Sequence, residues 1–173
     1  MTLRRGKLKR DFGAYAKMEA ANIFLVPGLA LWFGWPRLVA EIIAIGLAVA
    51  ACAGLLLVGT IFWRAIDQRL KGGDTPAFDR AMAFADSAER PMAIVTVAAS
   101  VAVAVALVRH GATSAIIAAA SLTLLAVLEY VNYYHRQLQV IDNLADFTRL
   151  FATRTFKRAH MARELAAYRS RRA

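Results

Sequence analysis

The sequence has little of what soluble and disulfide-stabilised proteins are built from. Of its 173 residues only 20% are charged, and it contains a single cysteine, Cys52. One cysteine excludes an intramolecular disulfide framework and a cysteine-based metal site. Hydrophobic residues make up 59% of the chain, whereas a soluble domain has roughly half. These proportions exclude a disordered chain and a water-soluble enzyme, and they favour a small membrane protein.

Four long stretches contain no charged residue. They cover 20–36, 42–63, 91–108 and 111–128. About 20 apolar residues, each rising about 1.5 Å in a helix, cross the roughly 30 Å of a bilayer core. The sequence therefore predicts an all-α, polytopic transmembrane bundle in one membrane domain, 1–173. Its four spans, approximately 16–36, 41–63, 91–109 and 112–134, form two hairpins. Pro27 and Gly28 interrupt the first span, and a re-entrant segment is the alternative there.

The cations lie almost entirely on one side of these predicted spans. Six precede the first span, five lie in the connection 64–90 and nine in the tail 136–173, whereas the other side keeps Arg37 and Arg109. Lys and Arg are retained on the cytoplasmic side. We therefore expect a multi-pass protein of the cell inner membrane with both termini cytoplasmic. The basic tail is expected to contact anionic inner-leaflet headgroups, and no nucleic-acid partner is expected.

The connection 64–90 is expected to be a cytoplasmic helical segment. Pro76 suits the first turn of a helix. Phe78, Ala81, Met82 and Ala85 then share one face, so a short amphipathic helix is predicted against the membrane surface or against the tail.

The basic tail 136–173 is also predicted to be helical, because it contains no Pro or Gly. Its apolar positions repeat about every 3.5 residues. They are Val140, Leu144, Phe147, Phe151, Met161, Leu165 and Tyr168. Three arrangements stay open: a long helix projecting into the cytoplasm, a helix on the inner leaflet, and a helical hairpin bent near 153–155.

The most polar local feature lies at the cytoplasmic end of the fourth span. Glu129, Asn132, Tyr133 and Arg136 stand at i, i+3, i+4 and i+7, with His135 on the flank of this face. An acid beside an amide, a phenol and a cation could bind a metal, a headgroup phosphate or a proton. These five are the candidate site residues, and Glu129, Asn132 and His135 are the candidate metal ligands. The alternative is an interfacial anchor in which Glu129 pairs with Arg136.

The pattern Glu129-x-x-Asn132 resembles the metal-binding Glu-x-x-Asn of bacterial diacylglycerol kinases, which are small, all-helical inner-membrane enzymes. The resemblance covers four residues. Those enzymes have another Glu seven residues after the first, where this chain has Arg136, and they have three spans. The resemblance implies lipid-phosphate chemistry as one alternative, and it does not assign the family. The sequence contains no phosphate loop, nucleophile elbow or zinc motif, so no cofactor is predicted.

A stripe of small residues, Gly46, Ala50 and Gly54, recurs every fourth position of the second span. It predicts close helix packing within the bundle, with a protein partner or with a second copy of the chain. Because the middle of the spans is almost free of polar groups, we expect a non-catalytic scaffold, accessory or assembly subunit. One alternative is an oligomeric channel or small transporter. The other is an interfacial lipid-modifying or metal-dependent enzyme using Glu129, Asn132, Tyr133 and His135.

Overall fold

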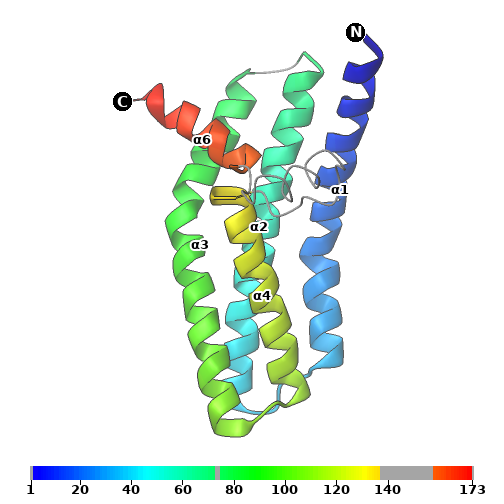
Figure 1. Cartoon of the computed structure of the whole chain (residues 1–173). Coiled ribbons are helices and arrows are strands. Elements are labelled where there is room, and N and C mark those ends of the chain that lie inside the picture. The colour runs from blue at the N-terminus through cyan, green and yellow to red at the C-terminus, as the bar shows by residue number, and fades with distance from the viewer. Residues whose placement is uncertain (1, 73–74, 137–157, 173) are drawn as a thin grey trace, which may run out of the picture.

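The computed structural model describes residues 2–72, 75–136 and 158–172, and this part of the chain is a helical bundle (Figure 1). Four long helices run up and down: α1 (Thr2–Phe33), α2 (Val39–Leu70), α3 (Thr75–His110) and α4 (Ser114–Tyr134). A short helix, α6 (His160–Ser170), crosses one end. The all-helical class predicted from the sequence is confirmed. In the described part, α2, α3 and α4 are each long and apolar enough to cross a membrane.

Two tight connections close the end of the bundle opposite α6. We call this end the outer end, after the topology expected from the sequence, and the end that carries α6 the inner end. Gly111 lies in the connection between α3 and α4 with a φ of 73°, a conformation that glycine adopts without steric cost. The side chain of Thr113 then caps α4 by accepting a hydrogen bond from the backbone N–H of Ile116 at 3.3 Å. The helices therefore reverse within a few residues, as hairpins require.

Glu41 joins the two outer connections. The Thr113 hydroxyl donates to Glu41 Oε1 at 2.7 Å, and the backbone N–H groups of Arg37 and Leu38 donate to Oε2 at 2.8 and 3.1 Å. These donors satisfy both oxygens of a carboxylate that is only 4% exposed. Glu41 therefore has a structural explanation and is not a candidate site residue.

The helices approach one another closely because their facing positions are small. Alanines with little or no exposed surface line the contacts of α2, α3 and α4. They are Ala44, Ala48, Ala51, Ala99, Ala106, Ala118, Ala119 and Ala126. Small residues allow helix backbones to pack where no hydrophobic effect drives association, as in a membrane.

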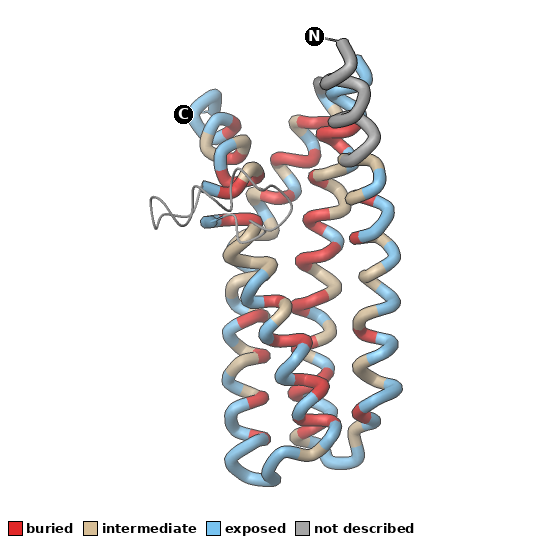
Figure 2. Tube along the Cα trace, turned by 45° about the vertical axis from the view of Figure 1, so that its right-hand side comes forward, coloured by how far each residue is buried: buried red, intermediate tan, exposed pale blue. Residues whose placement is uncertain are grey.

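The outward faces of the same helices are also apolar. On α3, five exposed residues follow one another at steps of three and four: Ile94, Val97, Val101, Val105 and Val108. Figure 2 shows this alternation of buried and exposed positions along the helices. A helix that is apolar both toward the core and away from it is typical of a membrane span.

The region 75–90 is helical, but the expectation of a separate short helix is wrong. α3 is continuous from Thr75 to His110, with Pro91 inside it. Proline removes one backbone donor, and membrane helices tolerate that loss. The predicted apolar face is nevertheless buried: Phe78, Ala81, Met82 and Ala85 are at most 5% exposed. The connection therefore consists of the inner ends of α2 and α3.

The tail does not continue α4, so the long projecting helix is also wrong. α4 ends at Tyr134, and the N–H of Ala159 donates to the carbonyl of His135 at 3.2 Å, which brings the chain back beside the end of α4. Met161, Leu165 and Tyr168 form the buried face of α6, as the periodicity predicted. The remaining predicted tail positions, Val140, Leu144, Phe147 and Phe151, and the bend near 153–155 lie outside the described residues.

Candidate functional site

The predicted polar face of α4 divides into an inward and an outward part. Tyr133 is only 2% exposed, and Glu129 and Asn132 are partly buried beside it. His135 and Arg136 are exposed. Because α4 ends at Tyr134, Arg136 no longer stands two helical turns from Glu129. Glu129, Asn132 and Tyr133 thus lie on α4, whereas the expected helical position of Arg136 on the same face is wrong; a functional role for these residues stays a prediction.

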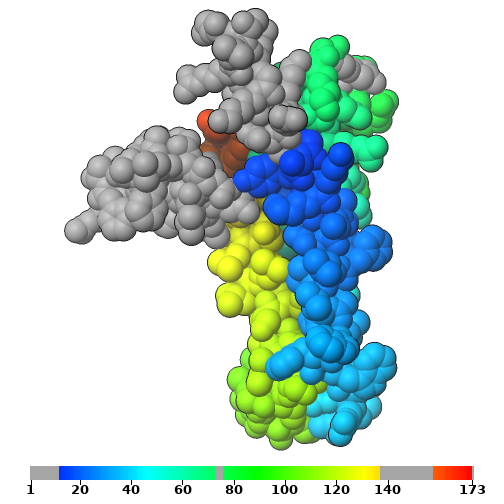
Figure 3. Space-filling model, turned by 90° about the vertical axis from the view of Figure 1, so that its right-hand side faces the viewer, coloured from blue at the N-terminus to red at the C-terminus, as the bar shows by residue number. Residues whose placement is uncertain are grey.

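A second acid, Glu19 of α1, lies opposite this face. The Tyr133 hydroxyl donates to Glu19 Oε1 at 2.9 Å, and the Trp63 indole N–H of α2 donates to the same oxygen at 3.0 Å. Glu19 is 7% exposed. Figure 3 shows α1 and α4 side by side along the bundle, which is why two residues 114 positions apart can bond directly.

Glycine at position 59 makes room for this contact. A Cβ atom added to Gly59 would lie 2.1 Å from Glu19 Oε2 and 2.2 Å from the Tyr133 hydroxyl oxygen. Real Cβ atoms essentially never approach so closely. The sequence of α2 thus leaves a space in which the side chains of α1 and α4 meet.

Both carboxylates keep an unsatisfied oxygen. Glu129 lies within hydrogen-bonding reach of the Tyr133 hydroxyl and the Asn132 amide. Even so, Oε2 of Glu19 and Oε2 of Glu129 are buried and have no hydrogen-bond partner among the described residues. A buried polar atom without a partner costs about 1–3 kcal/mol, and more if it is charged. We call Glu19, Glu129 and Tyr133, with Trp63 and Gly59, the acid–tyrosine site.

A cavity of ≈ 200 Å³ adjoins the acid–tyrosine site. Phe12 of α1, Phe62 and Trp63 of α2, and Asn132 and Tyr133 of α4 form its walls. Trp63 and Tyr133 thus belong both to the cavity and to the hydrogen bonds of Glu19.

α6 contributes the remaining side of the cavity through His160, Met161 and Arg163. The His160 ring stacks on Trp63 with centroids 6.2 Å apart. Burial, with a smaller contribution from Arg163, holds the pKa of His160 below its usual value. At neutral pH His160 is therefore uncharged, while Arg163 is exposed at the edge of the cavity.

Ion pairs hold α6 in this position. Arg169 donates to Asp86 and Glu89 on the inner part of α3, and Arg69 of α2 lies 3.5 Å from Glu164 of α6. The two acidic partners raise the pKa of Arg169. An open hollow of ≈ 700 Å³ beside this network is lined by the paired Asp86, Glu89 and Arg169 and also by Ser87, Arg90, Ala93 and Tyr130.

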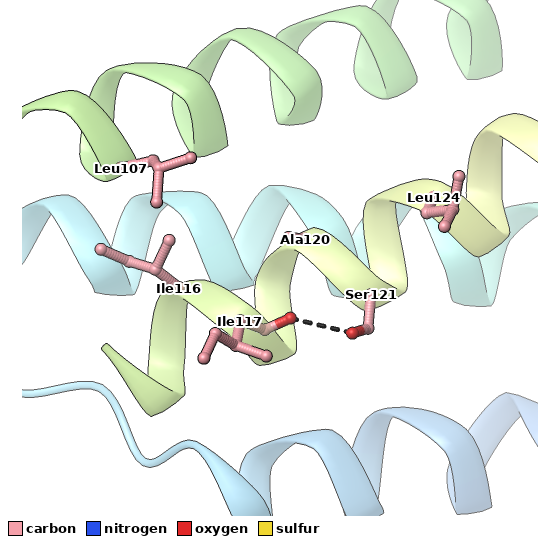
Figure 4. Close-up of a pocket in the computed structure, with 6 residues that line it drawn as sticks. All are labelled: Leu107, Ile116, Ile117, Ala120, Ser121 and Leu124. Carbon is pink, nitrogen blue, oxygen red and sulfur yellow. Dashed lines mark hydrogen bonds between the residues drawn. The ribbon is translucent and has the colours of Figure 1, made fainter. Parts of the chain in front are cut away.

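A further hollow, of ≈ 340 Å³, lies between α3 and α4 near the outer end (Figure 4). Its lining is aliphatic except for Ser121, whose hydroxyl donates to the backbone carbonyl of Ile117 at 2.9 Å. Because the Ser121 hydroxyl is already hydrogen-bonded, the hollow has no free polar side chain in its lining that would orient a ligand.

The small-residue stripe lies mostly outside the helix contacts. Gly46 would have nothing within 4 Å of an added Cβ, and Ala50 is exposed. Gly54 alone of the three approaches another helix, since its Cβ would lie 2.7 Å from Met92 Sδ of α3. The stripe as a contact surface for a partner stays a prediction.

Sequence reasoning missed Glu19, Gly59 and Trp63 as site residues. Counting residues from the ends of the helices could have identified Glu19. It lies fourteen residues before the end of α1 at Phe33, and Glu129 lies fifteen residues after the start of α4 at Ser114, so the two acids stand at nearly the same level of an up-and-down bundle.

The described residues contain no group of three or more His, Cys, Asp or Glu side chains placed to hold a metal ion. Comparisons of the chain with models of known protein families, with curated proteins and with solved structures find no match. The acid–tyrosine site is therefore interpreted from its own chemistry: two carboxylates, a shared phenol and two unsatisfied oxygens suit a positively charged ligand.

Proposed function

We propose that this is a four-span protein of the cell inner membrane with both termini in the cytoplasm. α1 supports a fourth span because it runs beside α2 and α4 and exposes Phe24, Leu29 and Trp32. The outer end carries Arg37 and Arg109 of the chain's 22 cations, which supports a cytoplasmic position for the opposite end.

The length of α4 supports a membrane position for the acid–tyrosine site. Its 21 residues extend about 31 Å, which matches the hydrocarbon core. The site lies near the inner end of α4, where α2 and α3 continue beyond it. The proposed site therefore stands at the cytoplasmic boundary of the apolar zone, within reach of ions from the cytoplasm.

A topology experiment tests this arrangement. A reporter fused after Ala173 is expected to read cytoplasmic, and a reporter inserted at Ala112, in the α3–α4 connection, is expected to read periplasmic. A periplasmic signal after Ala173 contradicts the proposed orientation.

We infer that the function of the protein is to bind a cation at the acid–tyrosine site. The observation that carries this inference is Glu19: it is 7% exposed, and its Oε2 has no partner among the described residues. A buried carboxylate without a compensating charge is strongly disfavoured. A cation between the carboxylates of Glu19 and Glu129 would remove that cost. Cation binding is also the property expected of the small-transporter class.

Trp63 provides a direct assay because its indole donates to Glu19. Replacing Trp32 and Trp35 by Phe leaves Trp63 as the sole tryptophan. Its fluorescence is followed in lipid nanodiscs during titrations with Na⁺, K⁺, Mg²⁺, H⁺ and an organic ammonium ion. We expect a saturable change with at least one of these cations.

The matched variants decide whether the change comes from the site. Glu19→Gln and Glu129→Gln keep the side-chain shape, remove the charge and are expected to abolish the response. Asp79→Asn is the control, because Asp79 is an exposed acid on α3 whose ion pair with Arg171 is 3.4 Å long. A response that survives Glu19→Gln, or the absence of any response, contradicts cation binding.

An accessory or assembly role is the second candidate, and the position of Gly46 favours it. Gly46 and Ala50 form a smooth, uncovered patch on α2, of the kind at which membrane helices associate. Gly46→Leu is expected to reduce the mass of the assembly that native mass spectrometry detects after extraction in mild detergent. Gly28→Leu is the control, since Gly28 is equally open on α1. Identical assemblies in both variants contradict this role.

A further inference from the structure

The outward face of α3 is apolar along its outer part and charged at its inner end. The exposed apolar stripe of α3 runs from Ile94 to Val108 at steps of three and four. Arg90, which is also exposed, precedes Ile94 by four residues and so continues the stripe. Val108 lies eighteen residues after Arg90, a rise of about 27 Å, close to the roughly 30 Å of a hydrocarbon core. Arg90 is therefore placed where the apolar stripe reaches the level of the lipid headgroups.

The open hollow of ≈ 700 Å³ lies at this charged end of α3, which α6 crosses (Figure 1). Both Arg90 and the neighbouring Ala93 line it, and we call it the α3 hollow. Asp86, Arg90 and Ala93 follow one another at steps of four and three, so they share one face of α3, and four residues later this face reaches Val97 of the stripe. The α3 hollow and the apolar stripe therefore adjoin on the same side of the helix.

The charged side chains that line the α3 hollow leave one charge of each sign without a counter-charge. Arg169 of α6 donates to both Asp86 and Glu89, so two carboxylates share one guanidinium and one negative charge is in excess. Both carboxylates are partly exposed and can accept further hydrogen bonds. Arg90 makes no ion pair or side-chain hydrogen bond with another residue of the described part. A ligand with one negative and one positive group would complement both charges.

We propose that the α3 hollow binds the headgroup of phosphatidylethanolamine. The phosphate contacts Arg90, the ammonium group contacts Asp86 and Glu89, and an acyl chain follows the exposed stripe of α3. An anionic headgroup would leave the excess carboxylate without a partner. The primary ammonium group has three N–H donors for the carboxylate oxygens, whereas the trimethylammonium group of phosphatidylcholine has none. The inference rests on the proposed position of the bundle in a membrane, and it is independent of cation binding at the acid–tyrosine site.

Native mass spectrometry of the full chain in detergent micelles tests the proposal with three lipids that have identical acyl chains. Phosphatidylethanolamine is expected to bind about fivefold or more tightly than phosphatidylcholine, which lacks the N–H donors, and phosphatidylglycerol, which lacks the ammonium group. Glycerophosphoethanolamine, the water-soluble headgroup without acyl chains, is expected not to bind at the same concentrations. Equal binding of the three lipids overturns the proposal, and so does equal binding of the lipid and the free headgroup.

Matched variants locate the binding site. Arg90→Gln removes the charge from an exposed position and is expected to weaken phosphatidylethanolamine binding about fivefold or more. Arg109→Gln is the control, because Arg109 is an exposed arginine at the outer end of the same helix. Glu19→Gln is expected to leave lipid binding unchanged, which distinguishes a failure of this proposal from a failure of the proposed cation binding. Equal lipid binding by Arg90→Gln and Arg109→Gln, at unchanged helical content, overturns the assignment of the headgroup to the α3 hollow.

Discussion

Gly59→Ala is the most direct test of the geometry at the acid–tyrosine site. The added Cβ would lie 2.2 Å from the Tyr133 hydroxyl oxygen and 2.1 Å from Glu19 Oε2, whereas ordinary contact begins near 3.4 Å. Each oxygen must therefore retreat by more than an ångström. Tyr133 and Glu19 cannot both do so and keep their hydrogen bond of 2.9 Å in place. The substitution is expected to separate α1 and α4 from α2 at this level.

The expected change in the free energy of unfolding combines two losses and one gain. Overpacking costs about 1–3 kcal/mol, and leaving a buried polar group without its hydrogen bond costs about 1–3 kcal/mol. These costs overlap, because movement that relieves the clash is the movement that breaks the bond. Alanine returns about 1 kcal/mol through its higher helix propensity. The net expected loss in the free energy of unfolding is about 2–4 kcal/mol.

The assay is titration of the micelle-solubilised protein with a denaturing detergent, followed by circular dichroism. Gly46→Ala is the matched control on the same helix, since its added Cβ would meet nothing within 4 Å. Tyr133→Phe in the Gly59→Ala background removes the hydroxyl oxygen that would lie 2.2 Å from the added Cβ, and it is expected to recover part of the loss. If Gly59→Ala is as stable as Gly46→Ala, the close approach of Glu19 and Tyr133 to α2 is refuted.

Two further predictions concern other contacts. The pKa of His160 is lowered in the folded protein, so the unfolded chain binds more protons near and below about pH 6.5. The free energy of unfolding is therefore expected to fall as the pH drops from about 7 to 5. His160→Phe keeps the aromatic stack and is expected to reduce that fall, and identical pH profiles of the two proteins contradict this prediction. Gly54→Leu is expected to cost about 1–3 kcal/mol in the same detergent titration, because its Cβ position is 2.7 Å from Met92 Sδ, and unchanged stability contradicts close packing of α2 on α3.

The apolar runs of the sequence predict where the chain can cross a membrane better than they predict where its helices end. The predicted second span, 41–63, lies within α2 (Val39–Leu70), and the predicted third, 91–109, lies within α3 (Thr75–His110). Both helices extend further on the inner side. Charge marks the limit of the apolar zone, whereas the helix itself continues as long as its backbone bonds and its buried face continue.

The sequence alone does not predict which of two small-residue faces of α2 is covered by other helices. Gly46 and Ala50 lie roughly opposite Ala44 and Ala48, because two residues of separation turn the helix by about 200°. Both faces are smooth enough for close packing, and the structure buries Ala44 and Ala48 while Gly46 and Ala50 stay exposed. Spacing alone identifies a surface that another helix can approach, and the remaining helices of the bundle decide which surface is covered.

The same limitation explains why the sequence singles out Glu129 and Tyr133 but not Glu19, Trp63 and Gly59. Glu129 stands out in the sequence because it ends an uncharged run of eighteen residues. Glu19 precedes a run of similar length, but it follows the basic N-terminal segment, where an acid looks like one charge among many. What distinguishes Glu19 is its direction: it faces Tyr133 and Trp63 across the space left by Gly59. That direction depends on the rotation of α1 about its own axis, which the packing of α1 against α2 and α4 determines. Glu19 can reach Tyr133 only in that rotation of α1, and its Oε2 still lacks a partner there among the described residues. Glu19 therefore contributes both to the packing of the helices and to the proposed cation binding. A loss of cation binding in Glu19→Gln, measured together with an unchanged helical content, would show that the binding role of Glu19 is separate from its packing role.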